Sequence, residues 1–377
     1  MILKNSSLVL RATGAGFLLG LLALAAQAQS GSAAAAGPVE KAKVEQPAIN
    51  AQAPTSSSPE LVLLDTDIGD DIDDAFALGL ILRSPELKLL GATSAFGDTE
   101  MRARLLDRYL VTTGHRELLI GAGAASEQKN VFTQSGYARG VAARRHAEGW
   151  VVFSTQVHAH PGQVTLIAIG PLTNLKQWIE RDPATFKLLK RIVVMGGSVR
   201  RGYDDPKTGA ETKSPSAEWN FLCDPAAAKA VLGSGVPVEL MPLDATQIHL
   251  PGAALVSILG RGTQLSDQLA ILYHQWLSGN EWKLSEPVLY DPLTVATILK
   301  PELCQWESLH LDVDEKGYSR PGQGAANAKV CTKSDAKAFL ELFTERLDQA
   351  LPPMIPEVQH ESQRPQLAPQ NRSPKGV

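Results

Sequence analysis

Short apolar runs that end in turn residues and precede helical patterns constrain the fold of this chain most strongly. Runs that are apolar throughout are typical of strands buried on both faces of a parallel sheet, with helices as the crossovers. We therefore predict an α/β fold, a single domain with a mostly parallel open sheet flanked by helices. The expected strands cover residues 61–64, 87–93, 164–169, 191–195 and 238–242, and the first expected helices cover 75–82 and 100–111, the latter with its charged face outward.

The two ends of the chain differ in composition from its middle. Lys4 and Arg11 precede an apolar run over 15–26 and the sequence Ala26-Gln27-Ala28, which predicts a signal peptide over residues 1–28. A retained signal anchor is the alternative. Residues 29–59 and 352–377 predict a disordered linker and a disordered tail, so the folded domain is expected over 60–351. The protein is then exported, periplasmic or secreted, with no stable membrane association after signal cleavage.

Charge and cysteine content exclude several kinds of function. The 377 residues include 36 Lys+Arg and 40 Asp+Glu, a net charge of −4 that provides no basic surface for nucleic acid. The three cysteines have no zinc-site spacing. Cys304 and Cys331 either pair or remain buried free thiols, and His158 and His160 fit one face of a strand without a third ligand.

Six aspartates lie within ten positions directly after the first expected strand, at Asp65, Asp67, Asp70, Asp71, Asp73 and Asp74. No Lys or Arg occurs between positions 61 and 82 to neutralise them. Crowded carboxylates cannot all stay ionised unless a cation or protons are supplied, and a hard divalent ion such as Ca²⁺ suits oxygen ligands. The alternative is a solvated acidic turn whose aspartates cap a helix.

Two other motifs begin with similar acidic residues. An EF-hand loop counted from Asp65 needs Gly at its sixth position and Glu at its twelfth, where this chain has Asp70 and Phe76. A phosphohydrolase of the haloacid dehalogenase type also begins with Asp-x-Asp after a strand, but Ile68-Gly69 departs from its pattern. We exclude the EF-hand and keep the phosphohydrolase as an alternative.

The acidic segment resembles the signature Asp-x-Asp-Pro-Gly-x-Asp-Asp-Ala of the inosine–uridine nucleoside hydrolase family, with two extra residues before Asp73. Further segments follow in the family's order: Phe96-Gly97-Asp98, Ala168-Ile169-Gly170-Pro171-Leu172-Thr173-Asn174, Met195-Gly196-Gly197, Ala217-Glu218-Trp219-Asn220-Phe221 with Asp224-Pro225, and Tyr290-Asp291-Pro292-Leu293. The resemblance covers nearly all of residues 61–345. It implies the Rossmann-like nucleoside hydrolase fold and a homo-oligomer, dimer or tetramer.

The resemblance also implies a ligand set and a substrate site. Ca²⁺ would be bound by Asp67, Asp74, the backbone carbonyl of Ile169 and Asp291. For the last of these, a helix cap before Pro292 is the alternative. The implied ribose ligands are Asp73, Glu218 and Asn220, the last two alternatively belonging to an ordinary polar loop. Asp98 stands where the family has Asn, and Thr173-Asn174 are expected to cap a helix.

The implied reaction is hydrolysis of the N-glycosidic bond of a ribonucleoside to ribose and free base, with Asp67 as general base on a metal-bound water. Tyr290 replaces the His that many family members have before the last metal ligand, so the proton donor to the base is either Tyr290 or another group. Trp219, Trp282 and Phe96 are candidates for stacking on the base.

We therefore predict a Ca²⁺-dependent N-glycosidase that acts on a small-molecule ribonucleoside. A non-catalytic nucleoside- or ribose-binding protein is the alternative from another class. The base pocket is expected from loops at 126–150 and 270–290, and the sequence leaves purine or pyrimidine preference open.

Overall fold

The computed structural model describes residues 58–140, 145–205, 208–281 and 283–349. The predicted signal peptide, nearly all of the linker, the tail and Trp282 lie outside these residues. Within them, no helix combines the length and apolar character needed to cross a membrane.

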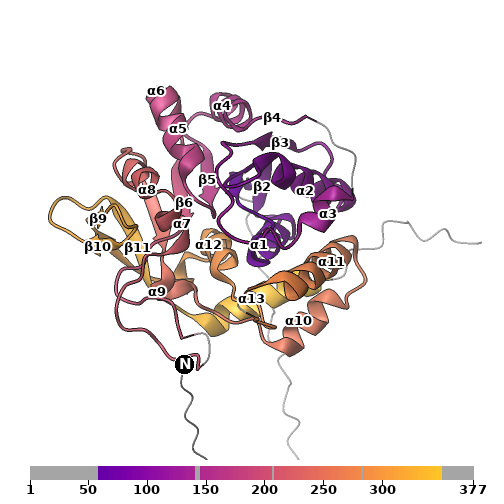
Figure 1. Ribbon diagram of the computed structural model, residues 1–377. Coiled ribbons are helices and arrows are strands. Elements are labelled where there is room, and N and C mark those ends of the chain that lie inside the picture. The colour runs from indigo at the N-terminus through magenta and orange to yellow at the C-terminus, as the bar shows by residue number, and fades with distance from the viewer. Residues whose placement is uncertain (1–57, 141–144, 206–207, 282, 350–377) are drawn as a thin grey trace, which may run out of the picture. The chain divides into compact units, whose positions relative to one another are not determined.

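A nine-stranded sheet forms the centre of the domain, in the order β4-β3-β2-β1-β5-β6-β7-β11-β8 (Figure 1). Neighbouring strands are parallel except β11 and β8, which are antiparallel. A separate antiparallel pair is made by β9 and β10. The strands are β1 Glu60–Thr66, β2 Leu87–Ser94, β3 Leu119–Ala122, β4 Ala147–Glu148, β5 Val164–Ala168, β6 Arg191–Met195, β7 Val238–Met241, β8 Cys304–Leu309, β9 Leu311–Val313, β10 Ser319–Pro321 and β11 Ala328–Ser334.

Helices pack on both faces of this sheet. Successive residues of β1 alternate between two hydrophobic clusters, with Val62 and Leu64 in one and Leu63 in the other. The first cluster includes α1, α2, α11, α12 and α13, and the second includes α4, α5 and α8. The helices are α1 Asp73–Leu82, α2 Thr99–Thr112, α3 Ser135–Arg139, α4 Gly149–Ala159, α5 Thr173–Arg181, α6 Pro183–Phe186, α7 Trp219–Cys223, α8 Pro225–Leu232, α9 Leu243–Thr246, α10 Gly252–Leu259, α11 Gln264–Gly279, α12 Tyr290–Leu299 and α13 Ala336–Asp348, with a 3₁₀ turn at Pro301–Leu303.

The predicted α/β class and the five predicted strands are confirmed as β1, β2, β5, β6 and β7. Cys304 and Cys331 form a disulfide between β8 and β11, with their Cα atoms 5.3 Å apart, and Cys223 is a free thiol. The sequence does not predict β3, β4, β8 and β11, because β3 and β4 are very short and the burial of β8 and β11 is interrupted by exposed residues.

Three local expectations are wrong. The charged face of α2 does not point wholly outward, because the Arg102 side chain is fully buried. His158 belongs to α4 and His160 ends that helix, so the pair does not lie on a strand. Much of the expected loop 270–290 is helical, since α11 continues to Gly279.

The order of strands reverses direction between β1 and β5, because β1 continues in the chain to β2 on one side of the sheet while β5 leads to β6 on the other. In open α/β sheets, such a switch point opens a crevice at the carboxyl ends of the two strands. The acidic segment follows β1 at this point, and Ile169-Gly170 follow β5.

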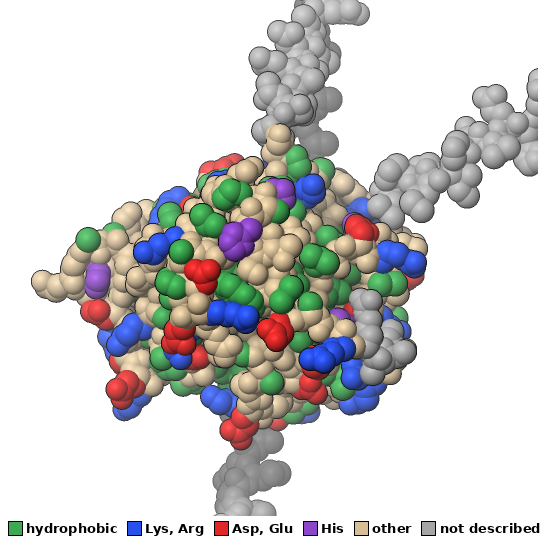
Figure 2. All heavy atoms as spheres, turned by 90° about the horizontal axis from the view of Figure 1, so that it is seen from above, with side chains coloured by type: hydrophobic (Ala, Val, Ile, Leu, Met, Phe, Trp, Pro, Cys, Tyr) green, Lys and Arg blue, Asp and Glu red, His purple; other side chains and the backbone are tan. Residues whose placement is uncertain are grey.

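Acidic and basic side chains are interspersed on the face shown in Figure 2, without a patch of one sign. This distribution agrees with the small net charge of the whole chain. Neither this surface nor the net charge provides the concentrated positive charge by which proteins bind a nucleic-acid backbone.

Candidate active site

Asp67 lies at the switch point, directly after β1, and its side chain is 7% exposed. The backbone after β5 approaches it closely: a Cβ atom added to Gly170 would lie 2.8 Å from both the backbone nitrogen and Oδ1 of Asp67. A side chain at position 170 would therefore displace the carboxylate. The absence of one allows the backbone at Gly170 to lie against Asp67.

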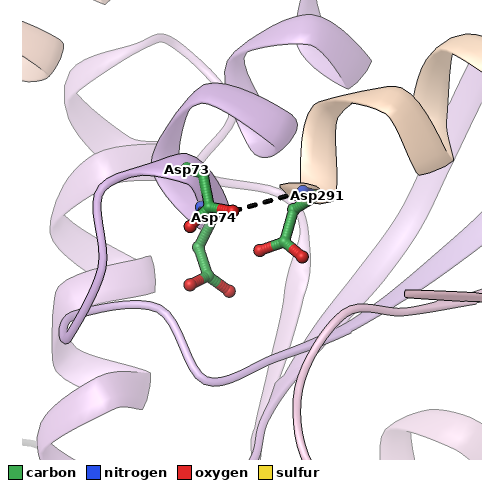
Figure 3. Close-up of side chains that lie close together, drawn as sticks. All are labelled: Asp73, Asp74 and Asp291. Atoms are coloured by element: carbon green, nitrogen blue, oxygen red, sulfur yellow. Dashed lines mark hydrogen bonds between the residues drawn. The ribbon is translucent and has the colours of Figure 1, made fainter. Parts of the chain in front are cut away.

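Three buried carboxylates meet next to Asp67. Asp73 and Asp74 belong to the first turn of α1, and Asp291 belongs to the first turn of α12, a helix that packs against α1 (Figures 1 and 3). One oxygen from each lies within 4.8 Å of the other two. The backbone N–H of Asp291 donates a hydrogen bond of 3.2 Å to Oδ2 of Asp73, which links the two helix ends.

Helix capping does not account for these aspartates. The N-cap residues of α1 and α12 are Ile72 and Leu289, and neither helix has a side-chain cap bond. The alternatives that made the acidic turn, or Asp291 alone, a helix cap are therefore wrong. Both helix N-termini nevertheless bring positive ends of peptide dipoles toward the carboxylates.

Burial and mutual repulsion raise the pKa values of the whole group. The pKa of Asp73 rises well above its ordinary value because the side chain is buried and lies near Asp71 and Asp67. Burial together with the charges of Asp67 and Asp73 does the same to the pKa of Asp74. Burial and the charges of Asp73 and Asp74 raise the pKa of Asp291 well above its ordinary range. Without a cation, burial and mutual repulsion thus favour the protonated forms of these groups.

Asp67 is itself strongly perturbed. Burial raises the pKa of Asp67 to about 7. The positive charge of Arg102 acts to lower this pKa, and the negative charge of Asp70 acts to raise it. A carboxylate with a pKa near the working pH is suited to accept a proton and release it again.

This donor set fits a hard divalent cation. Three carboxylates whose oxygens converge in a buried space are the ligands that Ca²⁺ prefers, and a cation there would remove the repulsion that raises their pKa values. The carboxylates that converge are those of Asp73, Asp74 and Asp291. The resemblance implied Asp67 in place of Asp73. Asp67 acts electrostatically on all three. The Ile169 carbonyl accepts a 3.3 Å hydrogen bond from Nδ2 of Asn220.

Glu218 and Asn220 lie on α7, across the ends of β5 and β6. The buried Glu218 carboxylate is the N-cap of α7 and accepts hydrogen bonds from the backbone N–H groups of Gly197 (2.9 Å), Asn220 (2.9 Å) and Phe221 (3.1 Å). Burial nevertheless raises the pKa of Glu218 to about 7. Asn220 donates from one amide nitrogen to the carbonyls of Ile169 and Met195. Both side chains are thus fixed by backbone at two strand ends.

Comparison with known proteins matches residues 62–341 to the model of the inosine-uridine preferring nucleoside hydrolase family. The chain belongs to this family. A pyrimidine-specific ribonucleoside hydrolase (RihA) from Citrobacter koseri is 29% identical over 315 residues, which cover 76% of this chain and 97% of that protein. The alternative of a haloacid dehalogenase-type phosphohydrolase is thereby replaced.

Solved structures of nucleoside hydrolases share the fold. A plant nucleoside hydrolase superposes with a TM-score of 0.67 at 22% identity, covering 78% of this chain and 100% of the plant chain. A purine-preferring ribonucleoside hydrolase from Gardnerella vaginalis superposes with a TM-score of 0.65 at 22% identity, covering 77% and 98%.

Aromatic side chains of this nucleoside hydrolase border the acidic group. Trp219 is half-buried and meets Phe96 edge to face, with ring centroids 5.8 Å apart. Tyr290, next to Asp291, meets Tyr203 in the same way at 6.3 Å. Tyr203 was missed by the sequence analysis, and its hydroxyl accepts a 2.9 Å hydrogen bond from the backbone N–H of Trp219. It follows no strand directly, so the strand-end criterion could not find it.

Asp98, which stands where the family has Asn, and Trp282 are the two other candidates for the substrate site. Asp98 is exposed and is the N-cap of α2, accepting a 3.0 Å hydrogen bond from the backbone N–H of Met101. Trp282 lies outside the described residues.

Arg102 lies outside residues 61–82, which contain no Lys or Arg, and was not among the predicted site residues. It supplies a positive charge to the acidic segment. Its Nη2 donates to Oδ2 of Asp70 at 2.7 Å, and both side chains are buried. A helical signal for its burial was present, because Arg102, Leu106 and Tyr109 are spaced on one face of α2.

Proposed function

We propose that this nucleoside hydrolase cleaves the N-glycosidic bond of ribonucleosides to ribose and free base in a Ca²⁺-dependent reaction, with Asp67 as general base. The observation that carries the proposal is the convergence of Asp73, Asp74 and Asp291 beside Asp67 at the switch point of the sheet. Family membership supports the reaction class. The buried donor set supports the ion.

Each chain residue has a defined part in this reaction. Water attacks the anomeric carbon, the bond from that carbon to the base nitrogen breaks, and its electron pair leaves with the base. Asp67 takes a proton from the attacking water. The negative charge around Asp67 stabilises the cationic character that the ribose acquires as the bond lengthens.

A Ca²⁺ held by Asp67, Asp73, Asp74, Asp291 and the Ile169 carbonyl would supply a positive centre that orients the ribose hydroxyls and the water. Glu218 and Asn220 would hold further ribose hydroxyls. Backbone N–H groups donate to the Glu218 carboxylate, and the Asn220 amide donates to backbone carbonyls, so both side chains are fixed in place. The resemblance assigns Asp73 to the ribose and Asp291 to the ion. Asp73 would serve both roles, because its carboxylate accepts a hydrogen bond from the backbone N–H of Asp291.

The leaving base must gain a proton, and Tyr290 is the proposed donor. Burial and the charges of Asp71 and Asp73 raise the pKa of Tyr290 above its ordinary value. The phenol therefore keeps its proton at neutral pH. Because the raised pKa also makes it a weaker acid, it would give up this proton only as negative charge develops on the departing base nitrogen. The Tyr203 ring, edge to face with Tyr290, restricts the orientation of that phenol.

A phenol in place of the family's usual imidazole also favours a second candidate function, a non-catalytic nucleoside-binding protein. The two are separated by incubating purified protein with inosine, uridine and a nitrophenyl riboside, with Ca²⁺ or with a chelator, and following the release of base or phenol. We expect turnover that the chelator abolishes and Ca²⁺ restores. Binding of ribose analogues without cleavage of any substrate would establish the binding protein instead.

The proposal covers ribonucleosides in general and does not choose between purine and pyrimidine bases. One relative is named pyrimidine-specific and one structural neighbour purine-preferring, and both cover most of this chain. Competition between inosine, uridine and cytidine in the same assay would assign it.

Export is part of the proposal. The predicted signal peptide supports it, and so does the disulfide between Cys304 and Cys331, because disulfides persist in oxidising compartments. Fractionation of cells that express the full chain should recover the oxidised protein outside the cytoplasm. Sedimentation of the same protein would test the proposed homo-oligomer.

A further inference from the structure

The fully buried side chain of Arg102 connects two loops that border the active site. Its guanidinium donates to the carbonyl oxygens of Phe96 (2.8 Å) and Ile68 (3.1 Å) and to that of Asp67. Phe96 follows β2, and Asp67 and Ile68 follow β1. One planar cation therefore fixes the backbone that carries the proposed general base.

Asp70, one of the six clustered aspartates, takes no part in the carboxylate group around Asp291. Its Oδ2 accepts hydrogen bonds from Nη2 of Arg102 at 2.7 Å and from Nε2 of Gln128 at 3.0 Å. Oε1 of Gln128 in turn accepts from Arg102 at 3.2 Å. The three side chains form a closed set in which the charge of Asp70 offsets that of Arg102.

Residues 128–134 are bound to the same acidic turn through its backbone. The backbone N–H of Gln134 donates to the Gly69 carbonyl at 2.9 Å, and Oγ1 of Thr133 donates to the Asp70 carbonyl at 2.7 Å. The Phe132 ring covers Gly69, where φ is +127° and an added Cβ would lie 2.1 Å from the ring. The guanidinium of Arg102 lies 4.6 Å from the centre of that ring.

The charge of Lys129 in this segment also acts on Cys223 of α7. Burial raises the pKa of the Cys223 thiol on α7 to about 12, and the charges that act on it include those of Asp67 and Lys129. Cys223 is therefore within electrostatic reach of both the proposed base and the segment 128–134.

We propose that Asp70 and Arg102 are positioning residues for the hydrolysis, and that the two-residue expansion of the acidic turn serves to hold segment 128–134 against the site. Gln128 connects the buried Asp70–Arg102 ion pair to segment 128–134. The hydrogen bonds from Arg102 to the Asp67 and Ile68 carbonyls connect the same ion pair to the proposed general base. This inference rests on the proposed function, because positioning of Asp67 matters only if Asp67 is the general base of the hydrolysis.

The test compares Gln128→Ala, Asp70→Asn and Asp70→Glu with the wild-type full chain. Gln128→Ala should raise KM for the nucleoside by about tenfold, as expected for the loss of a hydrogen bond to a charged group, with kcat changed less. Asp70→Asn leaves Arg102 without its counter-charge and should lower kcat as well, and Asp70→Glu should recover part of the loss. Hydrogen exchange at the Gln134 amide should accelerate in Gln128→Ala and Asp70→Asn.

Asn327→Ala is the matched control, because Asn327 is also a half-buried amide that bonds a loop, to the backbone N–H and carbonyl of Leu311. It should change neither KM nor exchange at 128–134. The proposal is overturned if Gln128→Ala and Asp70→Asn lower only the melting temperature and leave kcat, KM and exchange at Gln134 unchanged. An inactive wild-type protein would contradict the proposed function, and the exchange measurement would still decide whether Asp70 and Gln128 hold the segment.

Discussion

Asp70 and Asp74 are four positions apart in one acidic turn, yet their surroundings give them different parts. Asp70 is paired with Arg102 at 2.7 Å, whereas Asp74 accepts a hydrogen bond from the Thr66 hydroxyl and faces Asp67 and Asp73. The first carboxylate is neutralised within the protein. The second lacks a paired cation in its described contacts and is available to a metal ion.

Removing one of the converging carboxylates should remove the ion. We expect Asp291→Asn and Asp74→Asn to weaken Ca²⁺ binding and lower turnover by more than the 10- to 100-fold that follows loss of an outer partner of a metal ligand. Calcium titration calorimetry and steady-state rates measure both effects. Asp182→Asn, at the half-buried N-cap of α6, is the control and should match wild type. Full activity in either site variant would contradict the ligand assignment.

Tyr290→Phe isolates the proposed proton donor. Turnover of inosine and uridine should fall by about 10²-fold or more, the usual contribution of a general acid. Turnover of a nitrophenyl riboside should change little, because nitrophenolate leaves without a proton. Rates on both substrates, measured for the same preparation, check this. An equal loss on both would assign Tyr290 to positioning of the ribose or of Asp291.

At the scale of elements, the N-terminal ends of helices and the ends of strands bind one another through buried side chains. Thr173 and Asn174 were expected to cap α5, but its N-cap is Leu172 and has no side-chain cap bond. Asn174 instead donates to Oδ1 of Asp65 (2.8 Å) and to the Ser94 carbonyl (3.0 Å). Its Oδ1 accepts from the backbone N–H of Ala124 at 2.8 Å. One amide thus joins the ends of β1 and β2 to the loop after β3.

Asn174→Ala should destabilise the fold as well as the site. Two buried partners and one half-buried partner would lose a hydrogen bond, so the free energy of unfolding should fall by about 2–4 kcal/mol. Urea unfolding followed by circular dichroism measures the change. Gln177→Ala on the exposed side of the same helix is the control. A loss no larger than that of the control would show that Asn174 does not tie these strand ends together.

At the scale of the whole molecule, charge is arranged differently at the two edges of the sheet. At the start of the strands, Arg191 bonds Glu60 at 2.7 Å and Glu239 at 3.0 Å, and Lys329 bonds Glu239 at 3.4 Å. At the carboxyl edge, acids outnumber the buried cation Arg102. The excess negative charge is therefore confined to the edge where substrate is expected.

This arrangement predicts how stability depends on pH and Ca²⁺. Burial raises the pKa of Asp65 to about 6 and that of Glu218 to about 7, so the folded protein holds protons that the unfolded chain has lost above about pH 4 to 5. Without metal, the free energy of unfolding should then fall as pH rises from about 5 to about 7. Ca²⁺ should reverse the trend, since it binds ionised carboxylates.

Thermal unfolding at pH 5.5 and 7.5, with Ca²⁺ or chelator, measures both effects. The increase in melting temperature on adding Ca²⁺ should be larger at pH 7.5, and an ion at 100 times its Kd adds about 2.7 kcal/mol. Mg²⁺ at equal concentration is the control for ion specificity. A Ca²⁺ effect that is larger at pH 5.5 would contradict binding by these carboxylates.

The sequence by itself determined the α/β class, the buried strands and the position of the acids after β1, because apolar runs and turn residues are local signals. It also placed Asp291, Glu218 and Asn220 among the candidates through the order of the family's motifs. Both kinds of information depend only on neighbours along the chain.

The tertiary structure alone decided which acids meet and which are neutralised. Asp73, Asp74 and Asp291 converge because α1 and α12 pack together from positions more than 200 residues apart in the chain. Asp70 is paired because α2 turns Arg102 inward, and Tyr203 reaches Tyr290 from within the long loop between β6 and α7. Contacts of this kind depend on how whole elements pack, which local sequence patterns do not encode.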